Sequence, residues 1–211
     1  GFTEYSEAEI TDTPRLGSAT ALPAVELTPW RLRPSQATTA LPAPESQGIN
    51  LGTPWPSTVS DTARGTAIHL ALRTCLTRPD LTESLPRATG LDDTTLELVA
   101  ERAAALKAWL SSDGYTDLLC EIPLLGRTKK GAEIPGMIDL LAVGPKGCLL
   151  IDHKTGGAGE GFGLYWPQIS SYAALVARLF PQHPLQGLAV FWIDHGRLEL
   201  AQITATEPKV A

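Results

Sequence analysis

Two largely apolar segments, residues 133–143 and 147–153, are separated by a short turn between two glycines. Runs of this length bounded by glycine predict the two strands of a β-hairpin. A two-residue loop at Pro145-Lys146 places Asp139 directly opposite Asp152, with the Cβ atoms about 5 Å apart on one face of the sheet. The hairpin therefore predicts both the strand register and a pair of facing carboxylates.

Lys154 lies two residues beyond Asp152 and shares its face, because strand side chains alternate. Like charges that face each other on a half-buried sheet are destabilising unless a cation compensates them. A hard divalent ion would do so, and Mg²⁺ is the natural choice because it uses few protein carboxylates and keeps water for chemistry. The alternative is a buried ion pair with Lys154 that has only a structural role.

Helical and strand periodicity extends to both sides of this hairpin. The order is helix, helix, three strands, helix, two strands, which predicts an α/β fold with a central mixed sheet flanked by helices. The three strands form a β-meander. The expected elements are a helix from Ser60 or Asp61 through Cys75, a helix from Asp92 or Asp93 to Leu110, a strand at 117–125, the two hairpin strands, a helix at 164–180, and strands at 186–193 and 197–204.

Residues 1–59 are rich in Pro, Thr, Ala and Ser and show little periodicity. This composition predicts an irregular linker or wrapping segment, followed by one folded domain at 60–211. Its tryptophan-containing islands, 29–33 and 54–56, either dock on the domain or stay exposed; the sequence leaves both open.

The formal net charge of −6 is unfavourable for a chain that binds nucleic acid by itself. A metal-dependent nuclease, however, concentrates acidic residues at its site and can leave much of the grip on DNA to a larger polypeptide. The three cysteines are far apart without a CxxC pair, so we expect neither a zinc site, a disulfide framework nor an Fe–S cluster. No apolar run or signal-peptide pattern indicates a membrane, and we expect a cytoplasmic protein.

Four motifs occur in the order found in a known nuclease family. Together, over residues 60 to 200, they resemble the nuclease domain of RecB/AddA-type helicase-nucleases, within the PD-(D/E)xK superfamily. The motifs are Gly65-Thr66-Ala67-Ile68-His69, Gly136-Met137-Ile138-Asp139-Leu140-Leu141, Asp152-His153-Lys154-Thr155, and the helical series Tyr165, Gln168 and Tyr172.

The resemblance implies a restriction-endonuclease-like core and a set of site residues. Asp139, Asp152 and Lys154 would be catalytic, and His69, Asp139, Asp152 and the backbone carbonyl of His153 would bind Mg²⁺, for which Mn²⁺ would substitute. Two positions depart from the family pattern. His153 replaces the usual aromatic residue, and no acidic residue follows His69 one turn later.

Tyr165, Gln168 and Tyr172 share one helical face and could hold a phosphate or a DNA strand. The alternative is that the tyrosines are packing residues and Gln168 is solvated. Glu121 resembles a family acid that supports the site, and whether it binds the ion is open. The basic turn at 127–130 is equally consistent with a solvated loop and a phosphate contact.

The sequence therefore predicts a metal-dependent DNA nuclease. The resemblance implies the nuclease domain of a helicase-nuclease in double-strand-break repair or recombination, with a preference for single-stranded DNA. No GxxxxGK[ST] motif occurs, so we expect no bound nucleotide and a motor on another segment or a partner subunit. The alternatives are a catalytically silent module that binds DNA or a partner protein, and a stand-alone repair nuclease.

Overall fold

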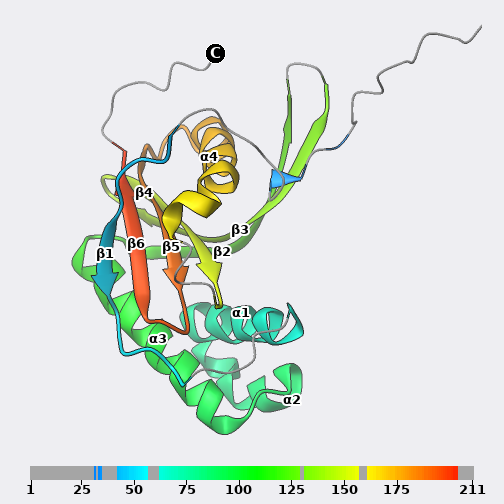
Figure 1. The fold of residues 1–211 in the computed structure, drawn as a ribbon, viewed down its shortest axis with the longest axis vertical. Helices are drawn as coiled ribbons and strands as arrows, with labels where there is room; N and C mark the ends of the chain where they lie inside the picture. The colour runs from blue at the N-terminus through cyan, green and yellow to red at the C-terminus, as the bar shows by residue number, and fades with distance from the viewer. Residues whose placement is uncertain are drawn as a thin grey trace, which may run out of the picture.

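The computed structural model describes residues 31, 33–34, 42–56, 62–128, 131–156 and 161–203. Within these ranges the chain forms a six-stranded mixed sheet in the order β1-β6-β5-β4-β3-β2, with helices on both faces (Figure 1). The expected α/β architecture is confirmed. The elements are β1 (Gln47–Asn50), α1 (Thr62–Thr77), η3 (Pro79–Ser84), α2 (Leu85–Thr89), α3 (Asp93–Ser112), β2 (Asp117–Arg127), β3 (Glu133–Gly144), β4 (Gly147–Lys154), α4 (Phe162–Leu179), β5 (Leu185–Trp192) and β6 (Arg197–Gln202).

The β3–β4 hairpin has the register that the sequence predicts as far as Leu140 and Ile151, but the pairing ends there, so Asp139 does not pair with Asp152 as expected. Its antiparallel pairs run from Leu140 opposite Ile151 to Gly144 opposite Gly147, which leaves Pro145-Lys146 as the two-residue loop. Strand β5 then pairs with β4 in parallel after the α4 crossover. Because α4 connects two adjacent parallel strands, it lies across one face of the sheet, above the ends that carry the candidate site.

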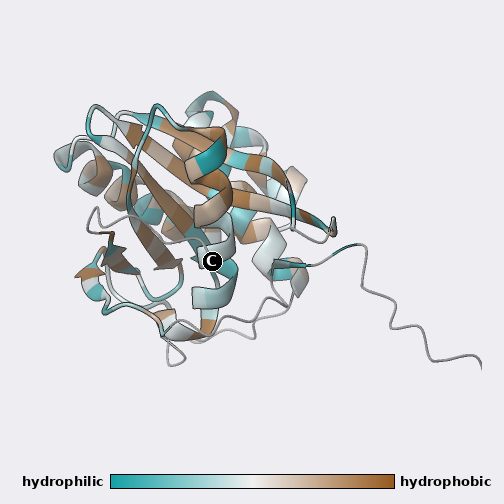
Figure 2. Cartoon of the chain, turned by 90° about the horizontal axis from the view of Figure 1, so that it is seen from above, coloured by the Kyte–Doolittle hydropathy of each residue, from teal (hydrophilic) through white to brown (hydrophobic). Residues whose placement is uncertain are grey.

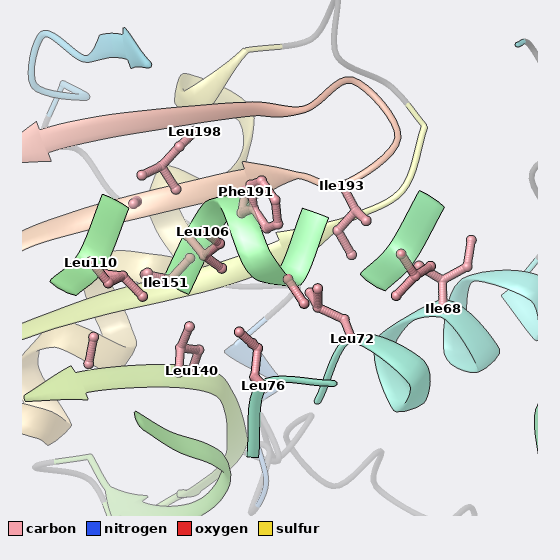
Figure 3. Packing of buried hydrophobic residues seen from close by; sticks show 14 of the residues in the cluster. Ile68, Leu72, Leu76, Leu106, Leu110, Leu140, Ile151, Phe191, Ile193 and Leu198 are labelled. Atoms are coloured by element: carbon pink, nitrogen blue, oxygen red, sulfur yellow. The ribbon is translucent and has the colours of Figure 1, made fainter. Parts of the chain in front are cut away.

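The sheet separates two hydrophobic cores. Helices α1 and α3 cover one face, where Leu72 and Leu106 meet Ile151 and Phe191 (Figure 3). Helix α4 covers the other face. Coloured by hydropathy, the central strands are hydrophobic where they lie between these helices (Figure 2). Burial of both sheet faces explains why β4 is apolar at consecutive positions rather than at alternate ones.

Strand β2 changes the core that it faces partway along its length. Leu118 and Cys120 pack against the α1/α3 core, whereas Ile122 and Leu124 pack in the α4 core. In a regular strand these four alternate residues would lie on one face. The change falls at Glu121, whose φ is 52°, a left-handed conformation that is unusual for a residue other than glycine. The backbone of β2 therefore turns over at Glu121.

Strand β3 makes the same change at Asp139. Leu140 packs in the α1/α3 core and Ile138 in the α4 core, so Asp139 lies at the point where the strand turns over. Beyond this point the hairpin of β2 and β3 projects past the other strands (Figure 1). It passes close under α4, where a Cβ atom on Gly136 would overlap the ring of Tyr172.

The helices begin close to the positions that the sequence predicts. Asp92 caps α3, because its carboxylate accepts a 2.8 Å hydrogen bond from the backbone amide of Thr95. The predicted capping residues of α1, Ser60 and Asp61, lie outside the described residues. None of the helices in the described ranges is long and apolar enough to cross a membrane.

Part of the segment that we expected to be irregular joins the sheet. Gln47–Asn50 forms the edge strand β1, antiparallel to β6. The following residues are fastened by the buried Arg102, which donates to the carbonyls of Leu51 and Thr53 and to that of Ile193. Its guanidinium lies 5.7 Å from the ring centroid of Trp55, which packs against the α1/α3 core. The Trp55 island is thus docked, whereas Trp30 lies outside the described residues.

The structure also contains two short elements without a predicted counterpart, η3 and α2, between α1 and α3. Both contact α1, and α2 also contacts α3. Their single buried residue, Leu85, belongs to the α1/α3 core. With one buried apolar residue among their eleven residues, η3 and α2 show no helical periodicity. The sequence pattern therefore does not predict them.

Candidate metal centre

Three side chains from separate elements lie close together just beyond the point where the pairing of β3 with β4 ends. They are His69 of α1, Asp139 of β3 and His153 of β4, and one ligand atom from each lies within 4.8 Å of the other two. Gly65, one turn before His69, allows α1 to approach closely, because a Cβ atom there would lie only 3.1 Å from Thr155 Oγ1. The close packing of this helix against the end of β4 brings His69 to the sheet.

The two oxygens of Asp139 have different partners. Oδ2 accepts a 2.7 Å hydrogen bond from the backbone amide of His153. Oδ1 lies 3.9 Å from His69 Nδ1, close enough for an electrostatic contact but too far for a hydrogen bond. One oxygen is therefore anchored to β4 while the other remains available as a ligand.

His153 is almost completely buried, with 3% of its surface exposed. Its ring packs edge-on against Phe191 and His69, at centroid distances of 6.0 and 5.7 Å. Within the described part of the chain its Nε2 atom has no hydrogen-bond partner. Burial holds the pKa of His153 well below its usual range, so the imidazole is neutral, which is the form that binds metals.

The imidazole of His153 is a candidate ligand that the sequence reasoning missed. The resemblance assigns only the backbone carbonyl at this position to the ion. A signal was present, because a histidine replaces the aromatic residue that the family usually has there. Alternation along β4 also points His153 away from Asp152 and Lys154, toward α1.

Asp152 and Lys154 form a second group on the α4 side. Lys154 Nζ lies 2.6 Å from Asp152 Oδ2, and Gln168 Nε2 donates to Asp152 Oδ1 at 3.2 Å. The amide of Gln168 is also 3.5 Å from the hydroxyl of Tyr172, and Lys154 lies 4.7 Å from the ring centroid of Tyr165. The three residues predicted to share one face of α4 are thus gathered around the lysine and its acid.

Burial disfavours the charged forms of both acids. It raises the pKa of Asp152 to about 6, against the opposing effect of the neighbouring Lys154 ammonium. It also raises the pKa of Asp139, against the effect of His69. The two groups are close enough for the charge of Asp139 to raise the pKa of Asp152 further. A divalent cation would relieve this repulsion.

A divalent ion fits the donor set that these residues provide. One carboxylate oxygen of Asp139 and one nitrogen from each imidazole converge. The buried Nε2 of His153 has no hydrogen-bond partner among the described residues. Asp152 does not belong to this three-residue group in the described ranges; its oxygens lie beside Lys154 and Gln168. The structure therefore holds the ligand group and the acid–lysine pair side by side.

The remaining sequence-derived candidates lie around this centre. Glu121 pairs with Arg73 at 2.8 Å and is not part of the ligand group. Arg127 pairs with Glu133 at 3.2 Å, and Lys129 and Lys130 lie outside the described residues.

Another residue that the sequence reasoning missed is Asp194. Its carboxylate accepts a 2.7 Å hydrogen bond from the amide of Gly156, and Ile193 donates to the carbonyl of Lys154. These bonds fix the end of β4 to the β5–β6 turn.

Two clefts flank the sheet at different distances from the centre. The larger, about 700 Å³, lies between α1, η3 and β2 and borders Glu121; Arg73, Leu119 and Phe180 contribute to its wall. The other, about 470 Å³, lies at the opposite end of the hairpin, beside Pro145 and Lys146. Of these two clefts, only the first borders a candidate site residue, Glu121.

No known family profile matches the sequence, and no curated protein does so. Among solved structures, 15 chains match. One of them is a protein from Eubacterium rectale named as a candidate exonuclease, with a TM-score of 0.45 and 11% sequence identity. The alignment covers 72% of this chain and 62% of that chain, so this chain spans less than two thirds of its length. The likeness concerns the fold alone.

Proposed function

We propose that this chain is a metal-dependent nuclease that hydrolyses phosphodiester bonds in DNA. The observation that carries the proposal is the convergence of His69, Asp139 and His153 beside the buried pair of Asp152 and Lys154. A divalent ion bound there would supply an activated water and neutralise charge on a phosphate. The sequence motifs support the same chemistry, because three of the four contribute these five residues and the fourth contributes Gln168, which contacts Asp152.

The residues have distinct roles in this proposal. His69 and Asp139 hold the ion, with Asp152 as a further carboxylate toward it. Lys154 has donors but no acceptor, so it neutralises the phosphate oxygens rather than binding the ion. Gln168 orients Asp152 through its 3.2 Å hydrogen bond, and Tyr165 supports the lysine through its ring.

The principal alternative is a nuclease-like module that binds DNA or a partner protein without cutting. The centre argues against this alternative. Two acids whose charged forms are disfavoured by burial reduce the stability of the ion-free protein, and a module without chemistry gains nothing from keeping them together.

We propose the finer assignment from the sequence resemblance. The chain would be the nuclease domain of a RecB/AddA-like protein that acts on single-stranded DNA in repair and leaves 5′-phosphate ends. Mg²⁺ would support the reaction and Mn²⁺ would substitute. A motor on the same polypeptide or a partner subunit would supply the strand. A stand-alone repair nuclease with the same centre is the other member of this class.

Cleavage of labelled single-stranded DNA, duplex DNA and RNA by the purified chain, without ATP, tests the proposal. We expect cleavage of single-stranded DNA with Mg²⁺ or Mn²⁺ and none with EDTA. Asp139→Asn should abolish it, whereas Asp113→Asn, at an exposed position after α3, should not. If the chain binds DNA but cuts nothing with either metal, the silent module is correct.

A further inference from the structure

We infer that the His153 side chain is itself a metal ligand, so that the centre prefers a first-row transition ion to Mg²⁺. The inference rests on the proposed function, since it concerns the ion used at the same centre. It goes beyond the sequence resemblance, which implies only a backbone carbonyl at this position. The consequence is a ligand group with two imidazoles and one carboxylate, from His69, His153 and Asp139, with Asp152 as the further carboxylate beside it.

The placement of His153 leaves its imidazole few other uses. The ring is held between Phe191 and His69 and is 3% exposed. Its Nε2 is buried without a hydrogen-bond partner among the residues that the structure describes. A buried polar atom without a partner is unusual and costly, and a metal ion is one way to satisfy it.

Contacts around His153 bring its side chain close to the other two ligands, His69 and Asp139. Its own backbone amide anchors Asp139 Oδ2, which directs the second oxygen toward His69. The ligand atoms of all three side chains then lie within 4.8 Å of one another. A single ion in the space between them can therefore contact two nitrogens and one oxygen.

This donor set decides which ion is favoured. Mg²⁺ prefers oxygen ligands and keeps much of its water shell, whereas imidazole nitrogen suits the first-row transition ions. Mn²⁺ is the weakest binder of that series, so a preference for Mn²⁺ over Mg²⁺ is the strictest test. Comparing the two affinities also shows what His153 contributes, because removal of its nitrogen should weaken Mn²⁺ binding far more than Mg²⁺ binding.

His153→Phe is the informative variant, since it keeps an aromatic ring beside Phe191 and removes the nitrogens. His183→Phe is its matched control, because His183 lies between α4 and β5, where its carbonyl meets Cys148 at the turn end of β4. Calorimetry would measure the Mn²⁺ and Mg²⁺ affinities of each protein separately, without reference to cleavage. Pulsed electron paramagnetic resonance of bound Mn²⁺ would detect imidazole nitrogen directly.

We expect Mn²⁺ to bind the unmodified chain more tightly than Mg²⁺. His153→Phe should weaken Mn²⁺ binding by about tenfold or more, as expected for loss of a ligand, and change Mg²⁺ binding much less. Nitrogen coupling should fall from two imidazoles to one. His183→Phe should change none of these values. If His153→Phe unfolds, His153→Gln replaces it and should have the same selective effect.

An unchanged ratio of Mn²⁺ to Mg²⁺ affinity in the folded variant, with unchanged nitrogen coupling, would overturn the inference. That outcome leaves the proposed nuclease activity intact if the unmodified chain still cuts DNA. Conversely, loss of Mn²⁺ selectivity in His153→Phe supports the inference even if no metal ion activates cleavage, in which case the proposed function alone fails.

Discussion

The backbone amide of His153 donates a 2.7 Å hydrogen bond to the carboxylate of Asp139. This bond lies beyond the last paired residues of β3 and β4, Leu140 and Ile151, so a side chain continues the connection where the backbone ladder ends. One bond therefore ties the strand that carries Asp139 to the strand that carries His153, Asp152 and Lys154. The ligand group depends on it.

Asp139→Asn should separate metal binding from folding. The amide oxygen of asparagine can still accept the hydrogen bond from His153, while the buried negative charge is lost. Because burial raises the pKa of Asp139, the metal-free variant should be at least as stable as the unmodified chain. Metal affinity should fall by about a hundredfold or more. Calorimetry measures the metal affinity, and urea unfolding in EDTA measures the stability of the metal-free protein. A variant that unfolds more easily than the unmodified chain would contradict the prediction that metal binding and folding are separable.

Lys154→Met should impair cleavage without loss of the ion. Methionine keeps an apolar stem beside Tyr165 but cannot neutralise a phosphate or pair with Asp152. We expect single-turnover cleavage to fall by about a hundredfold or more, the effect of removing one donor from a preorganised site. Metal affinity should stay the same or rise, because a nearby positive charge has gone. Cleavage at the normal rate would mean that Lys154 is only a structural counter-ion.

Gly136→Ala should disturb the α4 side of the site through packing alone. The added Cβ would overlap the buried ring of Tyr172, whose hydroxyl contacts Gln168. We expect a loss of about 1 to 3 kcal/mol in unfolding free energy, together with slower cleavage. Gly163→Ala is the control, because outside its own helix the one heavy atom of the described residues within 4 Å of its Cβ would be Ala43 Cβ at 3.9 Å. Chemical denaturation should leave this control within about 0.5 kcal/mol.

Ionisation of Asp152 should destabilise the metal-free protein as the pH rises from 3.8 to about 6. The pKa of Asp152 rises from 3.8 to about 6 on folding, so between these values the folded state binds more protons than the unfolded state. Its contribution is present at low pH and is lost as the pH rises through the folded pKa. Lys154, Asp139 and His69 face this carboxyl, and buried His153 has the opposite effect. The contribution of Asp152 must therefore be isolated by comparison with a variant that lacks its carboxyl group.

Asp152→Asn provides this comparison. In urea unfolding in EDTA, from about pH 5 to about pH 7, the stability of the unmodified chain should fall relative to that of the variant as the pH rises. Equal slopes would mean that Asp152 is ionised throughout this range in the folded protein.

Arg102→Met should release the segment that follows β1. The guanidinium donates to the carbonyls of Leu51, Thr53 and Ile193, and methionine removes all three donors, although the Ile193 carbonyl still accepts from the Gly196 amide. We expect a loss of about 2 to 4 kcal/mol in unfolding free energy. Arg87→Met, at an exposed position on α2, should change stability by less than about 0.5 kcal/mol. Guanidinium unfolding measures both, and similar losses would contradict a specific role for Arg102.

The hairpin shows how much of the fold local patterns determine. Its register follows from the two-residue loop at Pro145-Lys146, because any other loop would shift every pair. Helix α3 follows from apolar periodicity and the Asp92 cap. By contrast, β1 has four residues and is separated from its partner β6 by more than half of the chain. So short a segment has no periodicity of its own, and its pairing depends on contacts that the sequence does not display.

The amino-acid sequence by itself determined the α/β architecture, the hairpin register up to Leu140 and Ile151, and the list of candidate residues, because these depend on periodicity, turn residues and side-chain type. Tertiary structure decided how those residues are grouped. The β2–β3 hairpin turns over at Glu121 and Asp139, so Asp139 meets His69 and His153 while Asp152 meets Lys154 and Gln168. Alternation assumes a regular strand, and a change of face at one residue can be fixed only by the helices packed on either side of the sheet.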